Sequence, residues 1–165
     1  MLDVILVGFM GAGKTTVGQV LATNYQRPHI DLDDEIIALA GRSIPQIFAQ
    51  AGETIFRQWE TQALQQALAK KGVLSAGGGV VETAANRAML KQTHIPVIYL
   101  KVLPETVLSR LKGDTTRPLL QQGPAAVRAL WQRRLTLYEQ VATHAIVTDT
   151  LTPEAISQQI YQLLA

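Results

Sequence analysis

Residues 8–16 read GFMGAGKTT and contain the residue types from which phosphate-binding loops are built. Glycines let the backbone bend so that several N–H groups point at one anion and approach it closely. With Lys14 and Thr15 the stretch completes the pattern G-x-x-x-x-G-K-[ST], the P-loop. In this pattern the lysine reaches the β- and γ-phosphates of a nucleotide, and the hydroxyl holds Mg²⁺. The stretch therefore predicts binding of a nucleoside triphosphate together with a magnesium ion.

The surroundings of this loop favour a true phosphate site over a glycine-rich turn that binds nothing. The apolar run LDVILV precedes it, and a helical pattern starts at about Lys14, as the motif requires. The guanine-specific string N-K-x-D does not occur anywhere in the sequence. Its absence favours ATP over GTP, and an enzyme over a guanine-nucleotide switch.

Three carboxylates, Asp31, Asp33 and Asp34, follow a second apolar strand in HIDLDDEI. The carboxyl ends of parallel strands face the same edge of a sheet, so these side chains are expected beside the P-loop. Asp31 and Asp33 share one face if the strand continues. A carboxylate beside a phosphate site is offset by Mg²⁺ or faces an acceptor hydroxyl whose proton it takes. The alternative is an acidic loop in which Asp33 or Asp34 caps the next helix.

Two further stretches hold candidate residues for a substrate. Arg57 lies on a predicted helix in GETIFRQWE, where it either binds a ligand or forms a surface pair with Glu53. Gly77, Gly78 and Gly79 follow a third strand in SAGGGVV. Consecutive glycines are costly to order, which suits a backbone that approaches a ligand; a flexible loop is the alternative.

The polar stretch RLKGDTTRPLLQQGP, residues 110–124, joins two predicted helices and is a candidate lid over ATP. Its Arg117 could stabilise the charge of a phosphoryl group in transfer, unless the stretch is a plain surface loop. The later helix carries Arg133 and Arg134 in WQRRLTLYE. Adjacent residues of a helix point about 100° apart, so at most one of these arginines faces the site.

The elements that would position these residues alternate between strands and helices. Strands are predicted over 3–7, 28–32, 72–76, 96–101 and 144–148. Helices are predicted from Lys14, over 53–70, 83–92, 104–111 and 124–142, and after Thr152 as N-cap with Pro153 in the first turn. This alternation predicts one α/β domain with a parallel sheet.

Composition narrows the class of protein. The 165 residues are 47% apolar, enough for a real core, and contain no cysteine, which excludes disulfides and thiolate chemistry. A net charge of only +2 without a basic stripe gives no indication of nucleic-acid binding. The beginning of the chain has no basic region, and its apolar run is too short to span a bilayer. We therefore expect a cytoplasmic protein that does not contact a membrane.

Together these strings resemble the shikimate kinases, small P-loop enzymes similar to nucleoside-monophosphate kinases. The resemblance covers nearly the whole chain and rests on GFMGAGKTTVG, DLDDEI, GRSIPQIFAQAGETIFRQWE, LSAGGGVV, TTRPLL and RRLTLYEQVA, in that order. It implies a three-layer P-loop NTPase fold with a five-stranded parallel sheet in the order 2-3-1-4-5. It also implies a single domain over 1–165, with a substrate-binding segment at about 31–60 and a lid at about 110–124.

The resemblance further implies that ATP phosphorylates the 3-hydroxyl of shikimate, with one Mg²⁺ ion, in a monomeric enzyme. Lys14, Asp33 and Arg117 would be catalytic, with Asp33 as the base for the attacking hydroxyl. ATP would contact Gly11, Ala12, Gly13, Lys14, Thr15, Thr16 and Arg117, and the metal Thr15 and Asp31. Shikimate would contact Asp33, Arg57, Gly77, Gly78, Gly79 and Arg134, with the two arginines on its carboxylate.

Two departures and two alternatives accompany this interpretation. Family members often have serine at the position of Thr15, but either hydroxyl can bind Mg²⁺. Some also have an arginine against the adenine near 149–153, where this chain reads DTLTP. A related kinase, for gluconate or a nucleotide, would share the P-loop and lid. The second alternative is a regulatory domain that binds ATP through the P-loop but catalyses no reaction.

Overall fold

The computed structural model describes residues 2–165 and contains one five-stranded sheet in which every neighbouring pair of strands is parallel. The strand order is β2-β3-β1-β4-β5, which confirms the predicted topology. The strands are β1 Leu2–Val7, β2 His29–Asp31, β3 Gly72–Ser75, β4 Val97–Lys101 and β5 His144–Val147.

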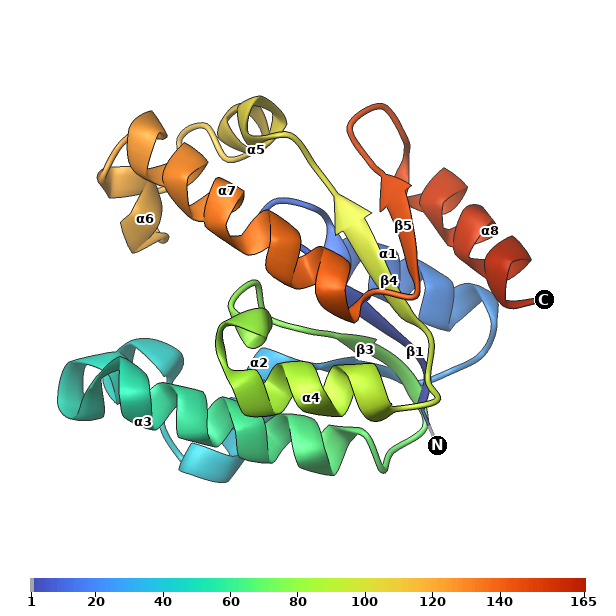
Figure 1. The fold of residues 1–165 in the computed structure, drawn as a ribbon, viewed down its shortest axis with the longest axis horizontal. Coiled ribbons are helices and arrows are strands. Elements are labelled where there is room, and N and C mark those ends of the chain that lie inside the picture. The colour runs from blue at the N-terminus through green and yellow to red at the C-terminus, as the bar shows by residue number, and fades with distance from the viewer. Residues whose placement is uncertain (1) are drawn as a thin grey trace.

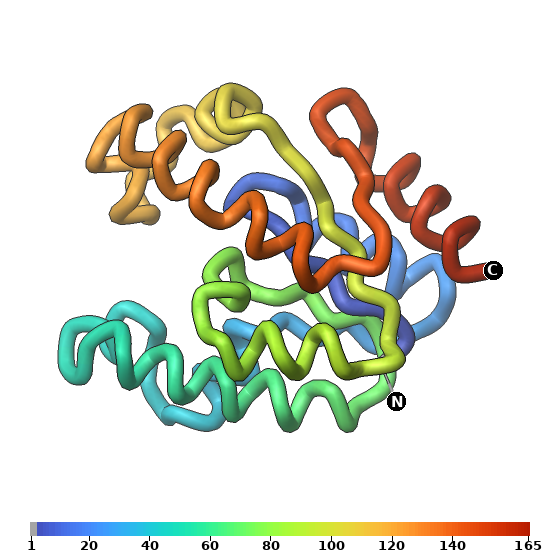
Figure 2. Tube along the Cα trace, in the orientation of Figure 1, coloured from blue at the N-terminus to red at the C-terminus, as the bar shows by residue number. Residues whose placement is uncertain are grey.

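Helices cover both faces of this sheet. Helices α4 and α7 lie in front of it in Figure 1, whereas α1 lies behind it and packs against α8; the tube in Figure 2 follows the same path. The helices are α1 Lys14–Asn24, α2 Leu32–Ala40, α3 Ile44–Ala67, α4 Ala84–Gln92, α5 Pro104–Arg110, α6 Pro118–Gln121, α7 Pro124–Val141 and α8 Pro153–Leu164, with the short 3₁₀ helix η1 Val80–Glu82.

Burial on both faces explains the apolar strands. Val4, Ile5, Leu6 and Val7 of β1 are at most 1% exposed, because the helices on either side exclude water from consecutive side chains. The register then fixes the functional edge. Leu6 of β1 and Asp31 of β2 both lie opposite Ser75 of β3, so three strands reach the same edge together. The P-loop, the carboxylates and the glycine triplet all follow these strand ends.

The segment between β2 and β3 differs from the sequence prediction. Helix α2 was not among the predicted helices and appeared only in the alternative with Asp33 or Asp34 as N-cap, and α3 begins at Ile44 rather than near residue 53. Helix α3 starts with a capping box in which Ser43 and Gln46 satisfy each other's backbone amides. At Gly52 the backbone leaves helical geometry, with φ 82°, so two helical pieces meet there. The prediction captured only the second piece.

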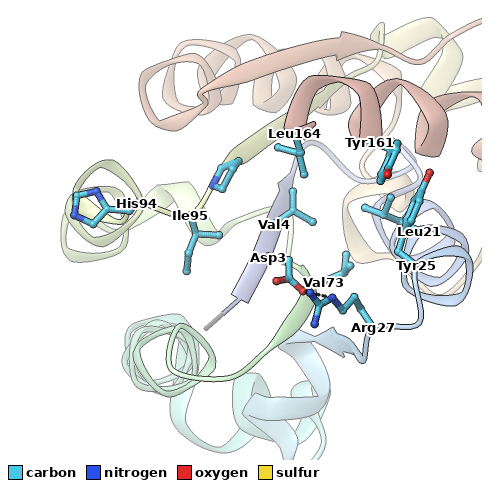
Figure 3. A pocket seen from close by; sticks show the side chains of 11 residues that line it. Asp3, Val4, Leu21, Tyr25, Arg27, Val73, His94, Ile95, Tyr161 and Leu164 are labelled. Atoms are coloured by element: carbon cyan, nitrogen blue, oxygen red, sulfur yellow. Dashed lines mark ion pairs between the residues drawn. The ribbon is translucent and has the colours of Figure 1, made fainter.

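The amino-terminal ends of the strands carry a hollow of about 490 Å³ on the side opposite the P-loop (Figure 3). Its wall includes an ion pair between Arg27 Nε and Asp3 Oδ2 of 3.1 Å. The rings of Tyr25 and Tyr161 stack there at 4.3 Å and tie the end of α1 to α8. These contacts join secondary-structure elements, and none of the predicted site residues lines this hollow. Within residues 2–165, no helix has both the length and the apolar character needed to cross a membrane.

Candidate active site

The loop over residues 8–13 runs from β1 straight into the first turn of α1. Gly13 is the N-cap of α1 and has φ 94°, a left-handed conformation that glycine adopts without strain. No side chain in the described part of the chain caps this terminus. The first amides of α1 have no intrahelical acceptor, and the positive end of the helix dipole lies with them. The loop and helix therefore form a site suited to phosphate.

Lys14 lies across this loop. Its Nζ donates hydrogen bonds to the main-chain oxygens of Gly8 at 2.6 Å and of Phe9 at 3.0 Å. Burial lowers the pKa of Lys14 to about 8, although the Asp33 carboxylate acts in the opposite direction. The ammonium thus fixes the loop and stands where phosphate oxygens can replace the two carbonyls.

Asp31 connects the end of β2 with the P-loop. It is both the last residue of β2 and the N-cap of α2. Its Oδ1 accepts the N–H of Asp33 at 2.9 Å, and its Oδ2 accepts the Thr15 hydroxyl at 3.3 Å. The strand ends at Asp31, so the condition under which Asp31 and Asp33 would share a strand face is not met, and the alternative with Asp33 or Asp34 as N-cap was wrong. The cause is that the Asp31 side chain already satisfies a free amide and starts the helix at once.

Asp33 therefore stands in the first turn of α2, and its carboxylate faces the glycine triplet. Its Oδ1 lies 3.3 Å from the position that a Cβ on Gly77 would take. The side chain is open to solvent inside the cavity, yet the surrounding protein raises the pKa of Asp33 by desolvation. The Asp31 carboxylate raises this pKa further, and Lys14 opposes both. A carboxylate with a raised pKa suits a proton acceptor.

The Thr15 hydroxyl and the Asp31 carboxylate, 3.3 Å apart, fit the predicted magnesium ion. Proteins hold Mg²⁺ with one or two carboxylates, water and substrate phosphates rather than with a full protein cage. Across the described chain no cluster of three His, Cys, Asp or Glu could form such a cage. The donor set is thus that of an ion held jointly by protein and nucleotide.

Gly77–Gly79 lie between β3 and η1 and accept hydrogen bonds from side chains of two helices. The Gly79 oxygen accepts Arg57 Nη1 of α3 at 3.0 Å, and the Gly78 oxygen accepts the Tyr138 hydroxyl of α7 at 2.5 Å. A Cβ on Gly79 would lie 2.5 Å from both Nη nitrogens of Arg57, so a larger residue would push the guanidinium away. This segment is ordered by its contacts and is not a free loop.

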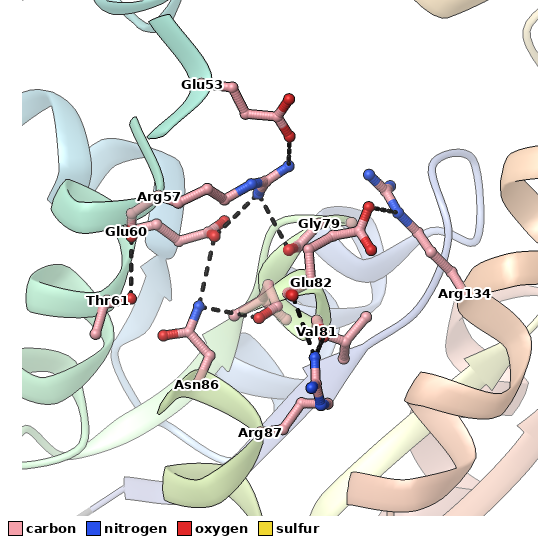
Figure 4. A network of polar contacts seen from close by, with 12 residues as sticks. Glu53, Arg57, Glu60, Thr61, Gly79, Val81, Glu82, Asn86, Arg87 and Arg134 are labelled. Carbon is pink, nitrogen blue, oxygen red and sulfur yellow. Dashed lines mark hydrogen bonds and ion pairs between the residues drawn. The ribbon is translucent and has the colours of Figure 1, made fainter. Parts of the chain in front are cut away.

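Arg57 is the centre of a polar network on α3 (Figure 4). Its Nη2 contacts Glu53 at 3.4 Å, the pair that the sequence left open, but its Nη1 also contacts Glu60 at 2.9 Å. Glu60 is 1% exposed and also accepts Asn86 Nδ2 at 3.5 Å. Burial raises the pKa of Glu60, while Arg57 lowers it. Sequence reasoning missed Glu60; its spacing of three residues from Arg57 was the available signal.

On α7, Arg134 is buried with 11% of its side chain exposed, whereas the side chain of Arg133 is 62% exposed. Arg134 alone therefore turns inward, in agreement with the expectation from helical spacing. Both guanidinium groups contact the same oxygen of Glu82, Arg134 through Nε at 3.3 Å and Arg133 through Nη2. Glu82 closes η1 and was not predicted as part of the site.

The predicted lid over residues 110–124 contains α6 and carries Arg117. Arg117 Nε pairs with Asp114 Oδ2 at 3.2 Å, and 45% of the Arg117 side chain is exposed. Arg110, at the lid's beginning, donates to the Gly11 oxygen at 2.8 Å and to the Thr148 oxygen at 3.0 Å. Arg110 thereby ties the beginning of this segment to the P-loop, a link between distant segments that the sequence did not reveal.

Most of the predicted residues share one cavity of about 360 Å³. Four predicted residues are not in its lining: Ala12, Gly79, Arg57 and Arg134. The two arginines lie past the glycine triplet, beside Gly79 and Gly78. A smaller hollow of about 260 Å³ adjoins it and extends toward Leu151 and Pro153. The two spaces share Gly11, Gly13, Thr16 and Arg110. The predicted residues that line the larger cavity are Gly11, Gly13, Lys14, Thr15, Thr16, Asp31, Asp33, Gly77, Gly78 and Arg117.

Comparison with known proteins gives consistent matches. A family model described as shikimate kinase matches residues 10–165. The chain is 43% identical to a shikimate kinase of Enterococcus faecalis over 99% of both chains. It is 41% identical to one of Synechococcus elongatus, over 99% of this chain and 86% of that relative. It also matches the structure of Acinetobacter baumannii shikimate kinase in complex with shikimate, with a TM-score of 0.90 and 42% identity over 98% of this chain and 91% of that one.

Proposed function

The chain belongs to the shikimate kinase family, and from that premise we propose that it transfers the γ-phosphoryl group of ATP to the 3-hydroxyl of shikimate. The products are shikimate 3-phosphate and ADP, and the reaction serves the biosynthesis of chorismate and the aromatic amino acids. The observation that carries the proposal is the shared cavity of Lys14, Thr15, Asp33 and Gly78, with two arginines just past the triplet.

In this proposal the ATP phosphates lie on the amides of residues 11–16, with Lys14 on the β- and γ-phosphates. The adenine occupies the adjoining hollow between Arg110 and Pro153. The residues that line this hollow contact the adenine in place of the arginine that the stretch DTLTP does not contain. Arg117 moves from Asp114 onto the nucleotide as the lid closes and excludes water. Its guanidinium then stabilises charge on the transferring group.

One Mg²⁺ ion would be held by Thr15 and Asp31. When bound, the ion would offset the negative charge of the phosphates. The hydrogen bond of 3.3 Å between the two side chains supports this pairing, because it holds both oxygens together in the lining of the cavity. The other tasks fall to the residues of the chain.

On the acceptor side, Asp33 orients the 3-hydroxyl and takes its proton as the oxygen attacks the γ-phosphorus. Arg57 and Arg134 bind the shikimate carboxylate, and the triplet Gly77–Gly79 contributes backbone contacts, with the Gly78 amide on the substrate. Alignment of this kind supplies much of the rate, since phosphoryl transfer needs little covalent help.

The proposal also covers the setting of the reaction. We propose that the enzyme works as a monomer in the cytoplasm, on ATP and shikimate alone, without nucleic acid or membrane as partner. The net charge of only +2 without a basic stripe supports the part of this proposal that concerns nucleic acid. Sedimentation at working concentration would test the monomer.

The lowered pKa of Lys14 predicts that ATP binding weakens as the pH rises through about 8. Below this pH Lys14 carries the charge that the phosphates need; above it, binding must first take up a proton. Well above pH 8, the KM for ATP should increase about tenfold with each further pH unit. Initial rates at saturating shikimate on both sides of this pH would show it. A KM for ATP that stays level well above pH 8 would contradict the assignment.

Replacement of Arg57 tests the carboxylate site. We expect Arg57→Ala to raise the KM for shikimate between about tenfold and a hundredfold, because hydrogen bonds to charged groups are strong. The kcat should change little. Arg57→Lys keeps a charge beside buried Glu60 but loses the forked geometry, so its KM should be intermediate. Arg42→Ala, which removes an arginine bonded to Gln50 in the same segment, is the matched control.

A substrate-side comparison completes the test of function. Shikimate methyl ester keeps the hydroxyls but has no negative charge, so it should be a poor acceptor for the wild-type enzyme. The Arg57→Ala variant should discriminate much less between acid and ester. Unchanged affinity for shikimate in Arg57→Ala would contradict the proposal that Arg57 binds the shikimate carboxylate. Preference for gluconate or a nucleotide would favour a related kinase instead.

A further inference from the structure

Glu82 lies where it can control the guanidinium that faces the acceptor. It is the last residue of η1, three positions after Gly79, so its backbone is tied to the glycine triplet. Its side chain is 17% exposed and reaches α7, where Oε2 accepts Arg134 Nε at 3.3 Å. The contact therefore joins the triplet to the buried arginine of α7.

The way Arg134 is held determines which of its edges stays available. Glu82 engages Nε, on the side of the guanidinium, and Figure 4 shows the two Nη nitrogens projecting past this contact. Nη1 lies 3.6 Å from the position that a Cβ on Gly78 would take. Besides Glu82, the Arg134 side chain contacts the Tyr138 hydroxyl, which itself donates to the Gly78 oxygen. The Nη edge, which can bind a carboxylate with two parallel hydrogen bonds, is thus held beside the triplet.

A lone carboxylate at this position would repel an anionic substrate, but Arg133 offsets it. Arg133 contacts the same Glu82 oxygen from the exposed side of α7. The cluster of Arg133, Glu82 and Arg134 therefore keeps one net positive charge. Around Arg57 the balance is reversed, since Glu53 and Glu60 share one guanidinium. The positive cluster at Arg134 therefore adds to the attraction that Arg57 has for an acceptor carboxylate.

We propose that Glu82 is a positioning residue for the acceptor: it holds Arg134 by Nε so that the Nη edge faces the substrate carboxylate, while Arg133 keeps the cluster positive. This inference rests on the proposed function. It assigns a substrate-binding role to two residues, Glu82 and Arg133, that themselves need not touch the substrate.

A positioning role and a purely electrostatic role of Glu82 predict opposite changes in the KM for shikimate when Glu82 is replaced by alanine. If Glu82 positions Arg134, the variant should raise the KM for shikimate about tenfold, with kcat and the KM for ATP within about twofold of wild type. If Glu82 acts only as a negative charge, its removal should lower that KM. Glu82→Gln keeps an acceptor oxygen, so its KM should lie between those of wild type and Glu82→Ala.

Glu105→Gln is the matched control, because it breaks another ion pair to α7, that of Arg128 with Glu105, away from the triplet. It should leave the KM for shikimate unchanged. Shikimate titrations by calorimetry, with thermal unfolding of each variant, would separate lost binding from lost folding. An unchanged or lowered KM in Glu82→Ala would overturn the inference if the wild type phosphorylates shikimate. A wild type that does not phosphorylate shikimate would overturn the proposed function itself.

Discussion

Replacing Lys14 with methionine should lower kcat about 10³-fold, the loss expected when one preorganised donor to a developing charge is removed. Methionine is close to lysine in length and apolar, so the packing of the P-loop changes little while the ammonium disappears. The two carbonyls that Lys14 now contacts, at 2.6 Å and 3.0 Å, can turn to water. The variant should therefore fold and fail in turnover.

The effect should fall on kcat more than on shikimate binding, because Lys14 stands on the phosphate side of the cavity. Single-turnover measurement of ADP formation, with shikimate affinity measured separately, would show the division. Lys70→Met is the matched control, since it removes a lysine from a surface pair with Glu35 of 2.5 Å. A kcat within a few-fold of wild type in Lys14→Met would contradict the role assigned to Lys14.

Replacing Asp33 with asparagine should lower kcat between about 10²- and 10⁴-fold, the range of general acid–base catalysis. Asparagine keeps the shape and can still bond the acceptor hydroxyl, but it cannot take the proton. Shikimate binding should therefore persist. Asp34→Asn, which changes the neighbouring carboxylate in the first turn of α2, should leave turnover nearly unaffected.

The pH dependence gives Asp33 a second signature. Desolvation and Asp31 raise the pKa of Asp33, and the acceptor needs the ionised carboxylate. The wild-type rate should thus fall as the pH decreases through this raised pKa. In Asp33→Asn that acidic decline should vanish. An Asp33→Asn variant that keeps both the rate and the decline would show that another group accepts the proton.

The sequence predicted the sheet well because its signals are local. Apolar runs marked all five strands, and Thr152 with Pro153 marked the beginning of α8, where the Thr152 hydroxyl accepts the Ala155 amide at 3.1 Å. Helix α2 was missed because Asp31 ends β2 and caps α2 in one residue, so no loop separates the two elements. The start of α3 was missed although Ser43 and Gln46 have capping-box spacing, because Gly52 interrupts the helical pattern.

The candidate site was only half visible in the sequence. The P-loop, the carboxylates and the triplet are contiguous motifs, and most of their predicted site residues line one cavity. The sequence did not indicate the contacts of Glu82 and Arg110, because their partners lie on other elements. It did not indicate those of Glu60 because that face of α3 was not recognised as buried. The contact between Glu82 and Arg134 spans 52 residues, and the one between Arg110 and Gly11 spans 99. Such pairs depend on the packing of the whole domain.

The most direct test is ADP release by the purified protein with Mg·ATP, with and without shikimate, beside gluconate and nucleoside monophosphates. Phosphorus NMR of the product would identify the hydroxyl that is modified. We expect strong stimulation by shikimate alone and a phosphate on its 3-hydroxyl. Stimulation by a different acceptor, or by none, would contradict the assignment of this chain's cavity to shikimate phosphorylation.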